Sequence, residues 1–269
     1  MKFQLKHTIA ILAIAFLFTS CSNDDNNEET ISGNGAITLE FDNVFKTANF
    51  AFNTNYTNSN GEVLNVTKLK YIVSNIVLTK EDGSTFIVPK SESYFIVDES
   101  IEESQDITLL NIPAGNYKSV QFGIGVDRAQ WELGADGQGD FLAKAQTAGM
   151  MWAWTGGYKF VNFEGTFTTP TNTTPTNFKV HTGKTMVSGV ENYNYATVTL
   201  NFPENEKALV RTSITPEVHL FVDVSKILDG NTVINLADAI GGNIMGGAKL
   251  ATITENLNAM ISVNHIHND

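Results

Sequence analysis

The chain has 269 residues, of which 29 are aspartate or glutamate and 17 are lysine or arginine, so its formal net charge is −12. An acidic chain without a basic patch cannot neutralise phosphates, and we therefore expect no nucleic-acid partner. The single cysteine excludes an intramolecular disulfide framework and a cysteine-rich structural zinc site.

The N-terminus has the pattern of a lipoprotein signal peptide. Lys2, Lys6 and His7 precede the apolar run of residues 9–18, which is too short to span a bilayer as a helix, and Cys21 follows shortly after it. We predict a signal peptide over residues 1–20 and acylation of Cys21 at the new N-terminus.

The segment after the cleavage site is acidic and rich in asparagine. Residues 21–34 read "CSNDDNNEETISGN" and resemble the surface-export tethers of Bacteroidetes-type lipoproteins; a solvated linker is the alternative interpretation. The expected location is therefore the outer membrane, with the protein facing the periplasm or the cell surface and held through its lipid. One domain is expected over residues 35–269.

Short alternating or apolar runs, separated by turn residues about every ten positions, follow from Gly35 onward. This pattern predicts an all-β fold, a two-sheet antiparallel β-sandwich with a few short helices. "EDGS" at residues 81–84 and "NIPAGNY" at 111–117 are predicted turns. The predicted strands are residues 36–42, 69–79, 84–89, 94–98, 106–112, 117–126, 158–167, 177–183, 195–202 and 216–224.

Three segments depart from this pattern. The apolar spacing within residues 128–154 predicts a short helix that leads into "WAW". The threonine, proline and asparagine residues of 168–177 predict a loop, and residues 248–263 predict an amphipathic helix near the C-terminus.

No nucleophile elbow, phosphate-binding loop, dinucleotide fingerprint or zinc-protease helix is present in the sequence, so we expect a binding protein and not an enzyme. Histidine is the most informative polar residue, because only four remain after the signal peptide: His181, His219, His265 and His267. Imidazole binds zinc, copper, iron and nickel. His265 and His267 are two residues apart, so an extended backbone would point both toward one ion. The alternatives are ordinary strand histidines and a disordered tail.

Other side chains widen the choice of metal. Met150, Met151, Met186, Met245 and Met260 offer thioethers that favour Cu(I), although methionine is usually a core residue. Asp127, Asp136 and Asp140 lie around glycines and offer oxygen ligands to calcium, but their spacing is not that of an EF-hand, and a solvated acidic loop is the simpler interpretation. The residue types alone indicate that Trp152 and Trp154 are aromatic residues of the hydrophobic core.

Several segments together resemble the MbnP-like family, the periplasmic copper proteins of methanobactin operons. The resemblance covers essentially the whole mature domain, and its most specific parts are "MMWAWTGGYKFVNFEG" at residues 150–165 and the ending "NHIHND". The other matching segments are residues 37–42, 67–84, 112–127, 179–183 and 218–228.

The resemblance implies a secreted copper-binding protein with histidine in its site. It also implies that a MauG-type diheme peroxidase-like partner oxidises a tryptophan to kynurenine, here Trp152 or Trp154. The sequence "HTGK" at residues 181–184 departs from the family pattern, so the resemblance supports a metal-binding role less strongly for His181 than for His265 and His267. We expect copper, as Cu(I), in a protein for copper capture or handling, beside a TonB-dependent transporter. The alternative is a surface carbohydrate- or protein-binding β-sandwich lipoprotein, in which the tryptophan pair forms an exposed stacking platform.

Overall fold

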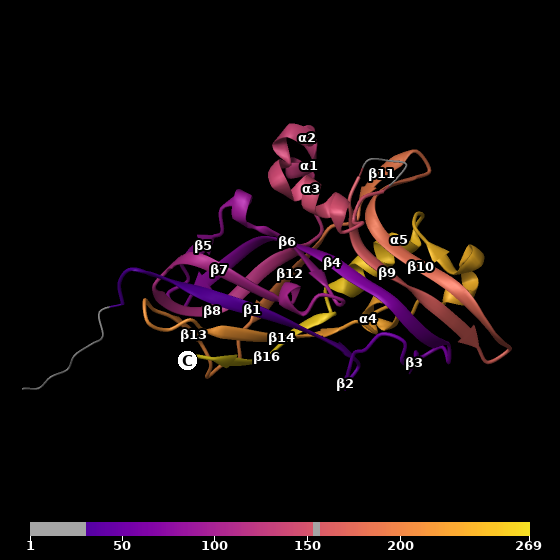
Figure 1. Ribbon diagram of the computed structural model, residues 1–269, viewed down its shortest axis with the longest axis horizontal. Helices are drawn as coiled ribbons and strands as arrows, with labels where there is room; N and C mark the ends of the chain where they lie inside the picture. The colour runs from indigo at the N-terminus through magenta and orange to yellow at the C-terminus, as the bar shows by residue number, and fades with distance from the viewer. Residues whose placement is uncertain (1–30, 153–156) are drawn as a thin grey trace, which may run out of the picture. The chain divides into compact units, whose positions relative to one another are not determined.

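Two β-sheets face each other across the main hydrophobic core (Figure 1). The computed structural model describes residues 31–152 and 157–269, which belong to one unit, Ile31–Asp269. The predicted signal peptide, Cys21 and Trp154 lie outside the described residues. Within the two described ranges, no helix has the length and apolar character needed to cross a bilayer.

The smaller sheet has five strands in the order β16-β14-β1-β2, with β7 also paired to β1. Its edge strand β16 is the last element of the chain and lies near the bottom of Figure 1. The strands are β1 (Asn34–Phe45), β2 (Ala48–Asn49), β7 (Asp106–Pro113), β14 (Glu217–Asp223) and β16 (Ile261–His267).

The larger sheet has eleven strands, six of them in the order β11-β10-β9-β4-β8-β12. The long central strand β4 pairs with β9 on one side and with β8 on the other. The strands are β3 (Asn55–Thr57), β4 (Val63–Lys80), β5 (Thr85–Ile87), β6 (Tyr94–Asp98), β8 (Gly115–Ile124), β9 (Lys159–Thr169), β10 (Asn172–Val187), β11 (Val190–Tyr193), β12 (Ala196–Asn201), β13 (Ala208–Val210) and β15 (Asn243–Ile244).

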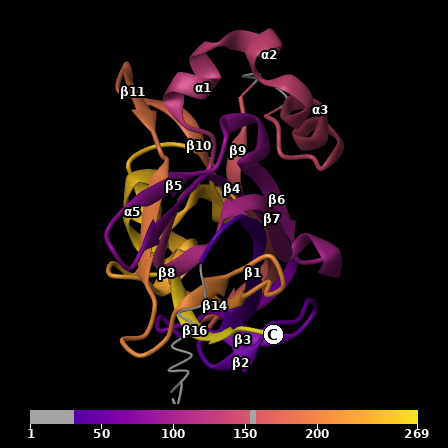
Figure 2. The same cartoon turned by 90° about the vertical axis from the view of Figure 1, so that its left-hand side faces the viewer.

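The helices are short, and three of them form one insertion between β8 and β9. Figures 1 and 2 show this insertion at the top of the unit, away from β16. The α-helices are α1 (Arg128–Glu132), α2 (Gly134–Gly137), α3 (Gly139–Thr147), α4 (Lys226–Asp229) and α5 (Lys249–Leu257). The 3-10 helices are η1 (Lys90–Glu92), η2 (Glu102–Ser104), η3 (Leu236–Asp238) and η4 (Ile240–Gly242).

Alternation along the strands decides which side chains enter the core. In β14, Val218, Leu220 and Val222 are buried in the main core, whereas His219 between them faces outward. Aromatic side chains from both sheets fill the interior, and Phe41 of β1 contacts Phe122 of β8 edge to face with ring centroids 5.6 Å apart. Because successive strand residues face opposite sides, the smaller sheet presents polar residues such as His219 on its outer face.

A second, smaller core lies between the outer face of the larger sheet and the helical insertion. Phe141 and Ala145 of α3 pack with Met150, Tyr158 and Phe160 in this core. The insertion therefore covers part of the larger sheet, and residues 150–152 contact β9 and β10.

The predicted all-β sandwich with a few short helices is confirmed. Every predicted strand overlaps an observed one, and the "EDGS" turn closes the hairpin of β4 and β5 through the hydrogen bond from the Lys80 N–H to the Ser84 carbonyl. Most pairings are antiparallel, but β1 with β14 and β10 with β15 are parallel.

Two local predictions are wrong. The C-terminal helix ends at Leu257 instead of continuing to residue 263, because Ile261–His267 pairs with β14 as an edge strand. The predicted loop of residues 168–177 is largely strand, because β10 begins at Asn172 and pairs back on β9. In both segments, hydrogen bonding to a neighbouring strand outweighs the helix or loop conformation that the local sequence favours.

Candidate metal centre

The segment around Trp152 forms a short antiparallel arm. Its backbone hydrogen bonds run from the Trp152 N–H to the Gly157 carbonyl at 2.7 Å and from the Lys159 N–H to the Met150 carbonyl at 2.8 Å. Trp152 is only 4% exposed. The buried ring of Trp152 therefore cannot form an exposed stacking platform.

Trp152 lies against His181 of β10. The two rings meet edge to face, with centroids 5.4 Å apart and an interplanar angle of 63°. Gly183 makes this approach possible, since a Cβ there would lie 2.9 Å from the Trp152 Nε1 and 2.5 Å from the Tyr158 carbonyl oxygen. The conformation of Gly183, with φ of +155°, is also one that other residues rarely adopt.

His181 is buried and neutral. Burial lowers its pKa to about 4, although Glu164 acts in the opposite direction. Its Nε2 lies 2.7 Å from Oε1 of Glu164 on β9, and Lys68 approaches the other oxygen of that carboxylate at 3.2 Å. Because a carboxylate accepts hydrogen bonds, the Nε2 carries the proton and the Nδ1 presents a lone pair.

The Nδ1 of His181 has no hydrogen-bond partner among the described residues. A histidine that donates one ring N–H to a carboxylate and keeps the other nitrogen free has the arrangement typical of a metal-binding imidazole. Glu164 was not predicted from the sequence. Its place opposite Lys179 in the pairing of β9 with β10 brings it to His181, and only that pairing reveals it.

The other three histidines lie together on the outer face of the smaller sheet. His219 of β14 is the register partner of His265 of β16, with ring centroids 4.7 Å apart, and the rings of His265 and His267 are 4.5 Å apart. Glu40 and Asp42 of β1 flank His219 on its other side, with carboxylate oxygens 3.7 and 3.3 Å from its Nε2.

The structure therefore divides the four predicted histidines into two places. His219, His265 and His267 share the outer face of the smaller sheet, whereas His181 is buried with Trp152 on the outer side of the larger one. In the described parts of the chain, no group of three or more His, Cys, Asp or Glu side chains has, in its present conformation, an arrangement that could hold a metal ion.

The methionines divide as well. Met150 and Met260 are fully buried core residues, and Met186 is 61% exposed on β10. Met151, directly before Trp152, is partly buried and pairs with Tyr158 in an isolated bridge. Met150 and Met151 are the methionines nearest to Trp152 in sequence, and of these two only Met151 is partly exposed.

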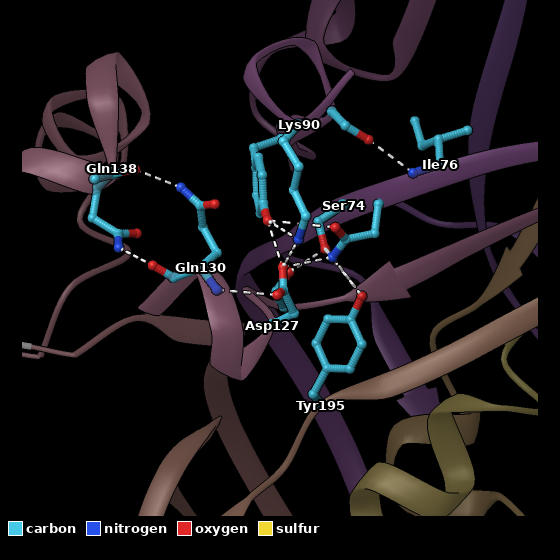
Figure 3. Close-up of polar contacts among 12 residues, drawn as sticks. Ser74, Ile76, Lys90, Asp127, Gln130, Gln138 and Tyr195 are labelled. Carbon is cyan, nitrogen blue, oxygen red and sulfur yellow. Dashed lines mark hydrogen bonds and ion pairs between the residues drawn. The ribbon is translucent and has the colours of Figure 1, made fainter. Parts of the chain in front are cut away.

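Asp127, one of the predicted calcium ligands, has a structural role. Figure 3 shows its carboxylate at the centre of polar contacts that fasten the helical insertion to the larger sheet. Lys90, Tyr94 and Asn75 donate to its Oδ2 at 2.7, 2.5 and 2.9 Å, and the N–H of Gln130 donates to its Oδ1 at the start of α1. These donors occupy the oxygens that a calcium ion would need.

Replacing Asp127 by alanine is expected to destabilise the protein by about 1–3 kcal/mol at neutral pH, through loss of a helix cap and of charge-assisted hydrogen bonds. Burial alone would raise the pKa of Asp127, but the bonds from Lys90, Tyr94 and Asn75 lower it from 3.8 to about 2. The contribution is therefore complete above pH 3.8 and is lost as the pH falls through about 2. Urea denaturation of the unmodified protein and of Asp127→Ala across this pH range measures the difference in their free energies of unfolding. A difference that stays constant down to pH 2 would contradict this prediction.

The chain was compared with known proteins. The solved structure of MbnP from Methylosinus trichosporium is similar, with 13% identity, a TM-score of 0.46, and coverage of 75% of this chain and 80% of that chain. No curated protein matches the chain. The model of the MbnP family matches residues 34–246, a range that includes Trp152 and His181 and excludes β16. The chain therefore belongs to the MbnP family.

Proposed function

We propose that the protein is a lipid-anchored, extracytoplasmic copper-binding protein that acts in copper capture or handling and catalyses no reaction. The observation that carries this proposal is the buried, neutral His181, whose Nε2 is held by Glu164 and whose Nδ1 is free among the described residues, next to Trp152. Membership of the MbnP family supports the choice of metal.

The side chains at this centre fit Cu(I). A neutral imidazole is a good copper ligand, and thioethers favour Cu(I) over harder ions. His181 would bind through its Nδ1, and the thioether that we propose as soft donor is that of Met151, which precedes Trp152 and packs against the edge of the second core. Burial keeps water and competing hard cations away, and Glu164 would fix the orientation of the ring.

Trp152 is the tryptophan that we propose is oxidised to kynurenine. Two hydrogen peroxide molecules, used through a diheme peroxidase-like partner, would place one oxygen on each of C2 and C3 as the C2–C3 bond breaks, with release of two waters. Hydrolysis of the resulting formamide by one water would release C2 as formate and leave a ketone and an aryl amine. The product can offer oxygen and nitrogen lone pairs where the indole offered only an N–H donor. The centroid distance of 5.4 Å between Trp152 and His181 supports this proposal, because the new lone pairs would lie beside the imidazole.

The proposal of a lipid anchor and of an outer-membrane location rests on the N-terminal sequence. Acylated Cys21 would hold the protein at the outer membrane, and residues 22–34 would separate the domain from the lipid. A TonB-dependent transporter in the same membrane is the proposed partner for copper passage. Detection of the mature chain with a diacyl or triacyl Cys21 by mass spectrometry tests this part of the proposal.

The test of copper binding is a Cu(I) titration of the untagged full chain against a chromophoric chelator, with and without co-expression of a diheme peroxidase. We expect one tight site, strengthened by co-expression, and a peptide mass that shows kynurenine at Trp152. Absence of tight binding in both preparations would overturn the proposal. A glycan array provides the comparison with a carbohydrate-binding function, which the burial of Trp152 disfavours.

A further inference from the structure

We infer that the protein has a second metal site, for a divalent transition-metal ion, formed by His219, His265 and His267 on the outer face of the smaller sheet. This site does not depend on the copper centre at His181, because it lies on the other sheet and uses different side chains.

The pairing of β14 with β16 creates the cluster. A register shift between His219 and Leu220 leaves Asn264 without a partner in the ladder, so that His265 lies directly opposite His219. His267 follows two residues later and points to the same side. Without this bulge, His219 would face a different residue and the three rings would not meet.

The distances between the ring nitrogens require only a small adjustment for metal binding. The Nε2 atoms of His265 and His267 are 2.8 Å apart. Two nitrogens bonded to one zinc ion at about 2.0–2.1 Å are about 3.3 Å apart in a tetrahedral site. The ring of His267 is exposed, and exposed side chains change rotamer within nanoseconds. Rotation of these rings therefore opens the pair to an ion.

His219 provides an independent indication of a ligand. Its side chain is 17% exposed, and its Nε2 is buried with no hydrogen-bond partner among the described residues, although Asp42 Oδ2 lies 3.3 Å away. That spacing between a nitrogen and an oxygen also matches two ligands of one metal ion. A small turn of this ring toward β16 joins the three imidazoles, with Asp42 as the fourth ligand.

The electrostatic surroundings favour a cation. Glu40 and Asp42 lie beside His219, and Glu217 is the register partner of His267. Three imidazoles with a carboxylate form a borderline ligand set suited to Zn(II) or Cu(II), in contrast with the softer copper centre at His181. The surface position is accessible to ions in the medium.

The test is a calorimetric titration of Zn(II) into the untagged full chain, with Cys21 alkylated so that its thiol cannot bind metal. We expect one Zn(II) per chain with a Kd in the micromolar range or tighter. Each of His219→Ala, His265→Ala and His267→Ala is expected to weaken binding by about 10-fold or more. Ser262→Ala, on the exposed face of β16, and His181→Ala serve as controls and should leave it unchanged.

Electron paramagnetic resonance of the bound Cu(II) form counts the imidazoles. Nitrogen couplings from three rings are expected in the unmodified chain and from two in His219→Ala. No binding tighter than millimolar, or affinity and spectra unchanged by His219→Ala, would overturn the inference. Loss of Zn(II) binding in His181→Ala would overturn the separation of the two sites, whereas Cu(I) binding tests the proposed function by itself. Circular dichroism confirms that each variant is folded.

Discussion

Replacing His181 by alanine is expected to lower the affinity for Cu(I) by about 100-fold or more, because even changes to groups that only orient a metal ligand cost 10–100-fold. The residue is the buried imidazole at the centre, and its Nδ1 is free of partners among the described residues. Competition against a chromophoric Cu(I) chelator, with the chain co-expressed with the diheme peroxidase, measures the effect.

Matched variants separate a ligand from a structural role. Glu164→Gln keeps a hydrogen-bond acceptor for the Nε2 of His181 but removes the charge, and it should weaken Cu(I) binding by roughly 10-fold. His219→Ala removes a histidine from the other sheet and should leave Cu(I) binding at its original strength. If His219→Ala abolishes Cu(I) binding while His181→Ala has no effect, copper is bound on the smaller sheet and the proposed centre is wrong.

Replacing Gly183 by alanine is expected to destabilise the fold by about 2–4 kcal/mol, from overpacking together with a backbone conformation that alanine adopts poorly. The added Cβ would lie 2.5 Å from the carbonyl oxygen of Tyr158 and 2.9 Å from Nε1 of Trp152. The arm that carries Trp152 must therefore move away from His181. Loss of Cu(I) affinity and of stability are expected together, by chelator competition and thermal denaturation.

Two other glycines serve as controls for this variant. Gly189, in the turn between β10 and β11, has φ of +80° with open space around it, so Gly189→Ala tests backbone strain alone. It should cost about 1 kcal/mol and leave copper binding intact. Gly246 also has open space and no unusual φ, and Gly246→Ala should be neutral. An equal effect of Gly183→Ala and Gly189→Ala would show that contact with Trp152 is unimportant.

The fold could be predicted largely from local pattern. Alternation of apolar and polar residues in segments such as "EVHLFVD" requires one buried face, and turn residues at 81–84 separate two strands. The errors fell where a segment has two local solutions. Residues 261–263 continue the helical spacing of residues 248–257, and they form a strand because the edge of β14 offers hydrogen bonds.

The candidate centre could be predicted only in part. The scarcity of histidine and the resemblance to the MbnP family pointed to all four histidines and to Trp152 or Trp154, and the family assignment is confirmed. Glu164 could not be predicted, because it reaches His181 through the register of β9 with β10. Asp127 was predicted as a possible calcium ligand. In the structure it accepts hydrogen bonds from residues of β4, η1 and β6, and these bonds hold the helical insertion to the sheet.

By itself, the sequence determined the kinds of ligand available, the β-sandwich class and the family, because these follow from composition, local alternation and motif. Only the tertiary structure decided which histidines lie together. His181 and His219 each follow a valine of the main core in their strands, yet one is buried beside Trp152 and the other shares a surface with His265. The physical reason is that strand pairing and the docking of the Trp152 arm join residues far apart in the chain, and these contacts have no local signature.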